Sequence, residues 1–482
     1  MTLSAIAPLH RTGRWSALSL IVAAQFMVVL DLSIVNVALA SIKSNLGFSS
    51  AGLQWVISAY ALTFGGFLLL GGRLSDLLGR RRLFMTGLTV FTLASALCGL
   101  AWSPASLVVF RAIQGVGGAM FAPAGLSLLM TRFEEGSDRN LALGIWGAAS
   151  GSGAAVGVLL GGLLTSALSW PWVFYINVPV GLAVILLTPG IIGESRAEGL
   201  GRHFDVAGAT TITASMMLLV FGLTKATQDG WSSAVTIGSL VISAVLAASF
   251  LAVERRAPSP LLPLQAFRGT TLGIGAVITA IIASVAFTQF FLLTLYLQQV
   301  LHYSAEKTGL AFVAIAGTVA VTSNVAQRFV TVFGPRKVLG TGMILSVVAM
   351  ALLVRLPVHA SYVRDLLPSF VLMGAALGTG FIAVTIASLA GTRPQHAGVA
   401  SGLVNTSRQV GGAVGLAATA TIASIVAGHS PTAAQLVHSD HIAFGVLTGL
   451  ALVGALLTPA LRPHREETHD VPDLAYALEE AA

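Results

Sequence analysis

Charged side chains are scarce in this chain of 482 residues. The 26 Lys and Arg and 19 Asp and Glu residues together make up 9% of it, whereas soluble domains carry roughly 25%. Apolar residues account for 55%. A soluble enzyme of this size would need far more charge to cover its surface, so that class is excluded. Disorder is excluded as well, because disordered chains combine low hydrophobicity with high charge.

Cysteine is nearly absent, and so are common sequence motifs of enzymes. A single cysteine, Cys98, excludes a disulfide framework and a CxxC metal site. No GxxxxGK[ST] phosphate-binding loop occurs. The net charge of +7 alone does not indicate a nucleic-acid partner, because nothing in the composition shows the charge gathered on one basic face. We therefore predict no enzymatic activity, no metal and no cofactor, and any pumping needs an energy source other than ATP.

Long apolar segments dominate what remains. About 20 apolar residues followed by a short polar break recur along the chain, and a helix needs about 20 residues to cross a bilayer. The first segment contains Asp31 and lacks a clear cleavage site, so we interpret it as a retained span. The pattern predicts an all-α integral membrane protein with fourteen spans, at 16–40, 54–72, 83–102, 105–130, 141–166, 171–192, 206–225, 232–252, 270–297, 308–327, 338–356, 366–390, 398–428 and 441–461.

The distribution of Lys and Arg predicts the orientation of these spans. Cytoplasmic loops carry an excess of positive residues. With a cytoplasmic N-terminus, the inner segments hold 19 of the 26 cations, the outer segments hold five, and Arg111 and Arg408 remain inside spans. An even number of spans leaves both termini in the cytoplasm. We expect a multi-pass protein of the plasma membrane that acts as a monomer in the lipid bilayer.

An internal repeat divides the chain. At an offset of 255, the loops after the second and tenth spans align an arginine, a glycine, two cations and Thr-Gly. A second match, at an offset of 258, pairs residues 144–157 with 402–415. The repeat predicts six-helix bundles at 16–192 and 269–461, joined by a linker at 193–268 with the two extra spans 206–225 and 232–252, and flanked by tails at 1–15 and 462–482. Parallel halves of this kind are a transporter design.

Three ionisable residues stand inside the predicted spans. Asp31 is the one carboxylate deep within a span, where a charge is costly and persists mainly at functional sites. Because burial favours the neutral form of a carboxyl group, Asp31 is a candidate proton carrier or cation site. Arg111 stays charged at any accessible pH and can pair with a carboxylate. Arg408 lies beside Asn405 and Gln409, and it either serves the function or extends toward the inner surface.

Other residues suggest a packing surface and a cavity. The spacing of Gly153, Gly157 and Gly161, followed by Gly162, predicts a bare helix face on which another helix packs closely. Amides and aromatic residues within spans could line a cavity for an amphipathic substrate. The candidate cavity residues are Gln25, Asn36, Gln114, Gln289, Phe290, Asn324, Asn405 and Arg408.

Several segments resemble one family. Residues 72–82, GRLSDLLGRRR, resemble the signature loop of the major facilitator superfamily, and residues 30–39, LDLSIVNVAL, resemble the first-helix motif of its fourteen-helix drug:proton antiporter branch. Residues 111–118, 153–162 and 170–181 are similar to that branch's motifs in the fourth, fifth and sixth helices. Two positions depart from the motifs: Val158 stands where a proline is usual, and Leu77 where an arginine is usual.

The resemblance implies alternating access, in which two halves rock about a central cavity. It implies that Asp31 and Arg111 handle the proton, and that a latch joins the halves on the cytoplasmic side. The implied latch residues are Arg73, Asp76, Gly79, Arg80, Arg81 and Arg82. The leading prediction is export of amphipathic drugs or antibiotics by proton antiport. Transport of a defined metabolite is the alternative, and a non-transporting membrane receptor or enzyme is a further one.

Overall fold

The computed structural model describes residues 11–196, 205–257, 260–262, 271–427 and 432–461, and the regular structure of these residues is helical throughout. The first six long helices are α1 (Arg11–Leu46), α3 (Trp55–Leu78), α4 (Arg80–Gly99), α5 (Pro104–Arg132), α6 (Ser137–Ala167) and α8 (Asn177–Ile191). Two more follow, α9 (Val206–Asp229) and α10 (Ala234–Glu254). The last six are α11 (Leu272–Leu295), α12 (Ala305–Phe333), α13 (Pro335–Leu353), α14 (Leu367–Leu389), α15 (Ala397–Ala427) and α16 (Ala433–Leu457).

Short helical segments connect or extend the long ones. They are α2 (Ser50–Leu53), α7 (Trp172–Tyr175), the π-helical turns η1 (Tyr296–Val300) and η2 (Tyr362–Leu366), and the 3-10 turns η3 (Pro394–His396) and η4 (Thr458–Ala460). The predicted span 171–192 is thus built from α7 and α8 together.

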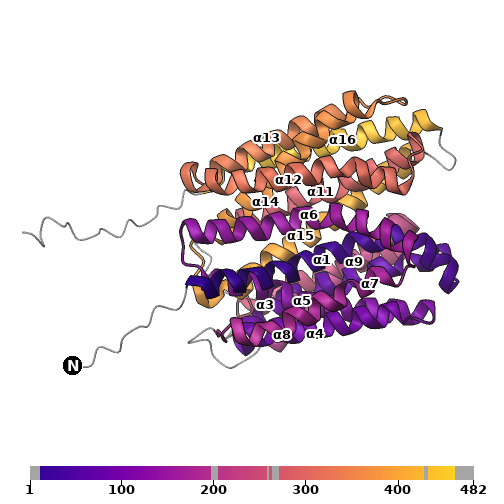
Figure 1. The fold of residues 1–482 in the computed structure, drawn as a ribbon. Coiled ribbons are helices and arrows are strands. Elements are labelled where there is room, and N and C mark those ends of the chain that lie inside the picture. The colour runs from indigo at the N-terminus through magenta and orange to yellow at the C-terminus, as the bar shows by residue number, and fades with distance from the viewer. Residues whose placement is uncertain (1–10, 197–204, 258–259, 263–270, 428–431, 462–482) are drawn as a thin grey trace, which may run out of the picture.

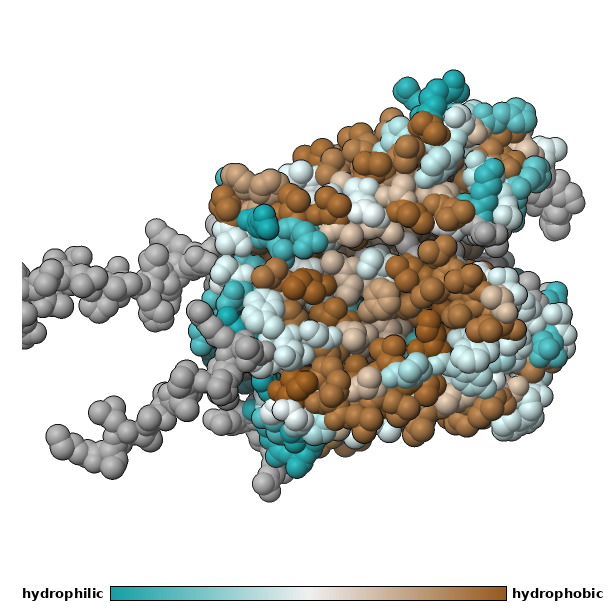
Figure 2. Space-filling model, viewed as in Figure 1, coloured by the Kyte–Doolittle hydropathy of each residue, from teal (hydrophilic) through white to brown (hydrophobic). Residues whose placement is uncertain are grey.

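Twelve of the described helical segments are long and apolar enough to cross a membrane. The predicted spans 141–166 and 398–428 correspond to α6 and to α15, which are 31 residues long each and lie outside this set of twelve. The fourteen-span count therefore stays a prediction. Figure 2 shows apolar residues covering the middle of the molecule and polar residues gathered near its two ends. Exposed leucines such as Leu93, Leu163 and Leu186 suit a lipid surrounding.

The first six and the last six long helices form two packed groups that meet along two seams (Figure 1). One seam joins α3 to α15, and the other joins α6 to α12 and α14. Helix α9 packs against both α3 and α15, and α10 packs against α9. Helix α1 begins and α16 ends at the same end of the bundle (Figure 1). We call this the arginine-rich end, because Arg80, Arg81, Arg82, Arg132 and Arg139 lie there.

The predicted repeat has a counterpart in backbone conformation. Gly79 has φ 111° and precedes α4, and Gly334 has φ 81° and precedes α13. These two glycines correspond at the 255-residue offset of the sequence. A positive φ is strained for residues with a side chain, so glycine is needed at both turns. The two loops therefore share a local conformation as well as a sequence pattern.

The predicted spans 398–428 and 441–461 leave a loop between them, which we expect to be solvated, but α16 already begins at Ala433. His438, Asp440 and His441 lie within α16, and Asp440 is buried. The helix begins earlier than the apolar pattern suggests because Thr432 and Gln435 form a capping box, in which each side chain bonds the other residue's backbone N–H. His429 lies outside the described residues.

The glycine face of α6 packs on α1 beside Asp31. A Cβ atom at Gly153 would lie 3.0 Å from Val29 Cβ, one at Gly157 would lie 2.9 Å from the Leu30 carbonyl oxygen and against Ser33, and one at Gly161 would lie 2.8 Å from the Ile34 oxygen. Gly162 has more room, with Val37 at 4.0 Å. The bare face thus brings the backbone of α6 against the turn of α1 that carries Asp31.

Replacing Gly157 with valine should destabilise the protein by about 1–3 kcal/mol, because the new side chain meets backbone that cannot move aside. Gly317→Val is a matched control, since Gly317 lies mid-helix in α12 with open space around it. The melting temperatures of the two purified variants in detergent test this expectation. Equal melting temperatures for the two would contradict close packing at Gly157.

Candidate functional site

Asp31 and Arg111 form a buried ion pair between α1 and α5. Arg111 Nη1 donates to Asp31 Oδ2 at 2.6 Å, and the two side chains are 1% and 0% exposed. Arg111 Nε also donates to the Val56 carbonyl oxygen of α3 at 3.0 Å. The pair was predicted only as two candidates for proton handling, and the structure places them in direct contact.

Polar side chains from α4, α5 and α8 complete the shell of Asp31. Gln114 Nε2 and Asn177 Nδ2 donate to Asp31 Oδ1 at 2.9 and 3.0 Å. Both amides also donate to Ser95 Oγ, at 3.2 and 3.0 Å, and Ser95 donates to the Phe174 carbonyl oxygen at 3.0 Å. Gln114 Oε1 accepts a 2.7 Å bond from Arg111. The carboxylate is therefore held by donors from two helices besides its own, α5 and α8, and Ser95 on α4 links the two amides.

Aromatic rings enclose the arginine of this site. The Arg111 guanidinium carbon lies 4.3 Å from the ring centre of Tyr60 and 5.7 Å from that of Phe174. Tyr60 is fully buried, and its hydroxyl oxygen has no hydrogen-bond partner. The rings exclude water from the ion pair, which strengthens the attraction between the charges in a medium of low dielectric.

The contacts of Asp31 and Arg111 offset the cost of burying two charges. Taking two ions out of water costs several kcal/mol each, so such a pair is retained where geometry and further hydrogen bonds offset that cost. Loss of the charge on Asp31 would weaken the bond to Arg111, while the amides of Gln114 and Asn177 can still donate to a neutral acid. The site is closed to solvent in this conformation, so proton exchange requires movement of the surrounding helices.

A second cluster joins the two groups of helices at the arginine-rich end. Asp76 accepts hydrogen bonds from Arg80 Nη2 at 2.8 Å and from the backbone N–H groups of Gly398 and Val399 at 3.1 Å each. Gly398 and Val399 lie in the first turn of α15, where a helix favours negative charge. Gly72 and Gly398 let the two backbones touch, because a Cβ on either would collide with the other's carbonyl group.

The other predicted latch residues contact partners on the side of the first group of helices. Glu194 accepts bonds from the backbone N–H groups of Arg81 and Arg82 at 3.1 and 3.2 Å, and its carboxylate lies 2.7 Å from a Cβ atom built at Gly79. Arg80 Nη1 donates to Ser195 Oγ at 2.8 Å. Arg73 is buried and lies in the electrostatic field of Asp76 and Glu254. Of the six residues, it is Asp76 that bonds the backbone of α15 directly.

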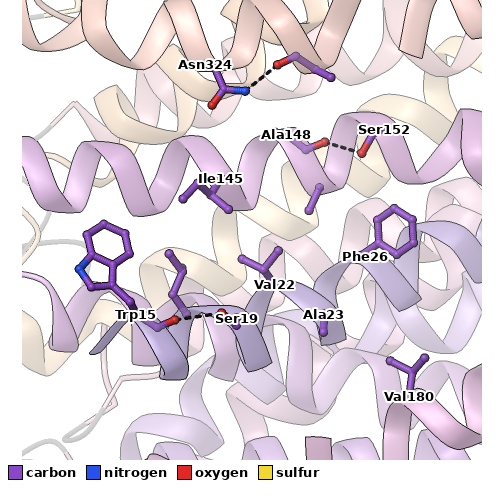
Figure 3. A pocket seen from close by; sticks show the side chains of 13 residues that line it. Trp15, Ser19, Val22, Ala23, Phe26, Ile145, Ala148, Ser152, Val180 and Asn324 are labelled. Carbon is purple, nitrogen blue, oxygen red and sulfur yellow. Dashed lines mark hydrogen bonds between the residues drawn. The ribbon is translucent and has the colours of Figure 1, made fainter. Parts of the chain in front are cut away.

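A partly open cavity of about 640 Å³ lies between α1, α6, α8 and α12 (Figure 3). Its lining is mainly apolar, with Trp15, Val22 and Phe26 on α1 and Ile145 on α6. Ser19, Ser152 and Asn324 are polar, but each donates a hydrogen bond to its own helix. The cavity therefore offers apolar contact area and little polar recognition.

The eight predicted cavity residues do not gather in one place. Asn324 lines the cavity, Gln114 belongs to the Asp31 shell, and Asn36 is exposed and bonded to Leu32. Phe290 stacks edge-on against Phe312, while Gln289 is buried with an unbonded Nε2. The remaining three, which lie nearer the seams, are Gln25, bonded to Ser150 on α6, Asn405, bonded to Ser401, and Arg408.

Arg408 is enclosed between aromatic rings where α6, α14 and α15 meet. Its guanidinium carbon lies 5.2 Å from the ring centre of Trp146 on α6 and 5.1 Å from that of Phe381 on α14. The side chain is 9% exposed, and its Nε and Nη2 atoms have no hydrogen-bond partner. It does not extend to the inner surface. Cation–π contacts contribute roughly 0.5–2 kcal/mol each, less than the several kcal/mol lost when an ion is desolvated.

Sequence reasoning missed several residues of these clusters. Ser95, Tyr60 and Glu194 carried no signal, because a lone hydroxyl in an apolar span and an acid in a loop are both common. Asn177 had a weak signal, since it stands in the 170–181 segment at the start of the sixth predicted span. Among the described residues, no group of three or more His, Cys, Asp and Glu side chains could hold a metal ion.

A bundle of apolar helices with an enclosed ion pair and an interface between two groups of helices defines a membrane transport protein. The family model named Major Facilitator Superfamily matches residues 21–416 and 275–476, so the chain belongs to this superfamily. It is a multi-pass membrane transporter and not an enzyme. A crystal structure titled as the human organic anion transporter MFSD10 (TETRAN) shares the fold, with a TM-score of 0.64 and 15% identity over 92% of this chain and 99% of that one.

Several of the similar proteins are named for antibiotic resistance or export. Puromycin resistance protein pur8 of Streptomyces alboniger is 38% identical over 95% of this chain and 93% of its own length. Cephamycin export protein CmcT of Amycolatopsis lactamdurans is 38% identical over 94% of each. The tetracenomycin C resistance and export protein of Streptomyces glaucescens is 35% identical over 84% of this chain and 74% of its own length.

Breaking the buried pair from one side should cost more than removing both charges. Arg111→Met leaves Asp31 unpaired and is expected to lower the free energy of unfolding by about 3–5 kcal/mol, and adding Asp31→Asn should restore part of it. Arg14→Met is the control, because the Arg14–Asp138 pair is partly exposed and worth about 0–1 kcal/mol. Unfolding titrations in mixed detergent micelles measure these three variants and the Asp31→Asn single variant. If the double variant loses as much free energy of unfolding as the two single variants together, the two residues are not coupled and the prediction is wrong.

Asp76→Asn should loosen the arginine-rich end. Loss of hydrogen bonds to a charged group costs about 1.5–3 kcal/mol, which corresponds to a roughly tenfold or greater shift toward the open form. Ser75 is buried beside Gly398, so a Ser75→Cys reporter in a Cys98→Ala background should react with a maleimide about ten times faster in the Asp76→Asn variant. The control is Asp138→Asn, and an unchanged rate in Asp76→Asn would argue against the latch.

Proposed function

We propose that this protein exports amphipathic drugs or antibiotics across the plasma membrane by proton antiport. The observation that carries the proposal is the fully buried Asp31, paired with Arg111 and held by the amides of Gln114 on α5 and Asn177 on α8. A carboxylate in such a place can exchange one proton per cycle, and its charge acts on groups from both α5 and α8. The names of the similar proteins support drugs or antibiotics as cargo.

The proton step changes the contacts between helices in the first group. When Asp31 takes up a proton on one of its carboxylate oxygens, its charge disappears and Arg111 loses its ionic partner. Arg111 still has the Val56 carbonyl oxygen, Gln114 and the Tyr60 ring as partners. The attraction between α1 and α5 thereby weakens. The bare glycine face of α6 allows α1 to move against α6. Release of the proton on the other side reverses the change.

The latch at Asp76 sets which end of the bundle is closed. In this conformation α3 and α15 are joined through Asp76, Gly398 and Val399. Opening of the arginine-rich end requires those hydrogen bonds to break, and Arg80 remains as a partner for the released carboxylate. Alternating access then consists of making and breaking this contact in step with the protonation of Asp31.

For the membrane topology of the protein, we propose the arrangement that the sequence predicts. Fourteen spans form two six-helix bundles, 16–192 and 269–461, with 193–268 between them, and both termini lie in the cytoplasm together with the arginine-rich end. The transporter acts as a monomer and needs no cofactor, because the proton gradient supplies the energy. The apolar cavity between α1, α6 and α12 supports an amphipathic substrate rather than a strongly hydrated one.

Asp31→Asn should abolish proton-coupled efflux while leaving the protein in the membrane. A susceptibility panel in a host that lacks its own efflux pumps identifies the compounds that the wild type exports. Inverted vesicles then report proton release when each compound is added. We expect no compound-driven proton release from Asp31→Asn vesicles, because an amide cannot carry the proton.

The control is Asp229→Asn, which makes the same chemical change at a partly exposed pair with Lys225 and should leave transport unaltered. Normal compound-driven proton release from the Asp31→Asn protein would overturn the assignment of Asp31. A wild type that protects the host from no compound in the panel would overturn drug export itself.

A further inference from the structure

We propose that Arg408 is a binding site for the anionic group of an amphipathic aromatic substrate, which would lie at the seam where α6 meets α14 and α15. This inference rests on the proposed function and names a substrate class for it. The ligand chemistry is an organic anion, with a carboxylate or sulfonate on an apolar ring system.

No acidic side chain of the described residues pairs with Arg408. The described buried arginines Arg80, Arg111 and Arg139 each form an ion pair, and Arg73 lies near Asp76 and Glu254. No ion pair involves Arg408, and no acidic side chain of the described residues contributes to its electrostatic surroundings. An uncompensated cation inside a membrane protein is costly, so its retention points to a counter-charge supplied during the transport cycle.

The geometry leaves the hydrogen-bonding edge of the guanidinium available. Trp146 and Phe381 approach the guanidinium at similar distances, 5.2 and 5.1 Å, while Nε and Nη2 remain unbonded. A guanidinium group donates in its own plane and binds a carboxylate through two parallel bonds. The indole ring of Trp146 and the phenyl ring of Phe381 offer stacking surface for the apolar part of the same ligand.

The position of Arg408 suits a site that opens in turn to each side. Arg408 is the twelfth residue of α15, so it lies about 16 Å from the start of that helix, near the middle of a bilayer core about 30 Å thick. Trp146 belongs to the first group of helices, whereas Phe381 and Arg408 belong to the last group. A Cβ atom at Gly147 would lie 2.9 Å from Ile382, so the two groups touch directly beside the arginine.

Neighbouring polar groups add to the site. Gln25 donates to Ser150 Oγ, one helical turn after Trp146 on α6, and its own Oε1 is buried without a partner. Asn405 lies one turn before Arg408 on the same helix and is buried. These amides can bond polar groups of a ligand that is held by its anionic end, so the seam combines one cation, two amides and two aromatic faces.

The test uses two probes that differ only in charge, naphthalene-2-sulfonate and naphthalene-2-sulfonamide. Purified full-length protein is reconstituted in vesicles of phosphatidylcholine, and transport of each radiolabelled probe is measured under a pH gradient. We expect the wild type to transport the sulfonate. Arg408→Gln should lower sulfonate transport about tenfold, corresponding to the loss of one charge-assisted contact, and change sulfonamide transport less than about twofold. Arg408→Lys should retain most sulfonate transport.

Binding is measured separately, so that a transport defect is not mistaken for a folding defect. The sulfonate should raise the melting temperature of the wild type and of Arg408→Lys by about 2 °C or more at saturating concentration, and should leave that of Arg408→Gln unchanged. Equal losses for both probes, or an equal rise in melting temperature with and without Arg408, would overturn the proposal and leave a packing role. An Arg408-dependent rise given by phosphatidylglycerol instead of the sulfonate would also overturn it, in favour of a lipid phosphate site.

The two proposals fail in different ways. If the wild type transports the sulfonamide with proton exchange but neither binds nor transports the sulfonate, the anion site is wrong and proton-coupled export stands. If the wild type transports neither probe nor any compound of the susceptibility panel, the proposed function is wrong, and with it the anion site.

Discussion

The cost of keeping charge away from water governs this structure. Asp31 and Arg111 are tolerated in the interior because they face each other at 2.6 Å and because amides of Gln114 and Asn177 satisfy the carboxylate. That shell requires α1, α4, α5 and α8 to converge on one point, and the glycine face of α6 is what brings the neighbouring helix close enough to seal it. The tight packing of the first group of helices is thus a condition for holding the ion pair.

The internal repeat supplies similar backbones to the two halves but different chemistry. Gly157 on α6 and Gly415 on α15 each pack against the backbone of a neighbouring helix, at Leu30 and Ser284. At the same 258-residue offset, however, the neutral Ser150 of α6 corresponds to the cationic Arg408 of α15. The first half holds an ion pair whose two charges cancel, and the second half holds the single positive charge of Arg408.

Much of this architecture could be predicted from the sequence, because spans and intramembrane charges leave strong signals. The candidates Asp31 and Arg111 were identifiable one by one, since a charge in an apolar run is conspicuous. Their contact was not, because it joins residues 80 positions apart. Ser95 and Tyr60 gave no signal, since uncharged polar residues are ordinary in membrane helices. Asp440 was misplaced in a loop because an apolar count cannot detect the capping box at Thr432 that begins α16 earlier.

The two seams between the helix groups are not equivalent. Helix α9 packs over the seam of α3 and α15, whereas the cavity beside α6 and α12 is partly open in the part of the chain that the structure describes. In the proposed export, a compound dissolved among lipid tails would meet this second seam without passing through water. For such compounds, partitioning between water and bilayer sets the local concentration at the protein, so apparent affinity would rise with solubility in lipid even when every contact with the protein stays the same.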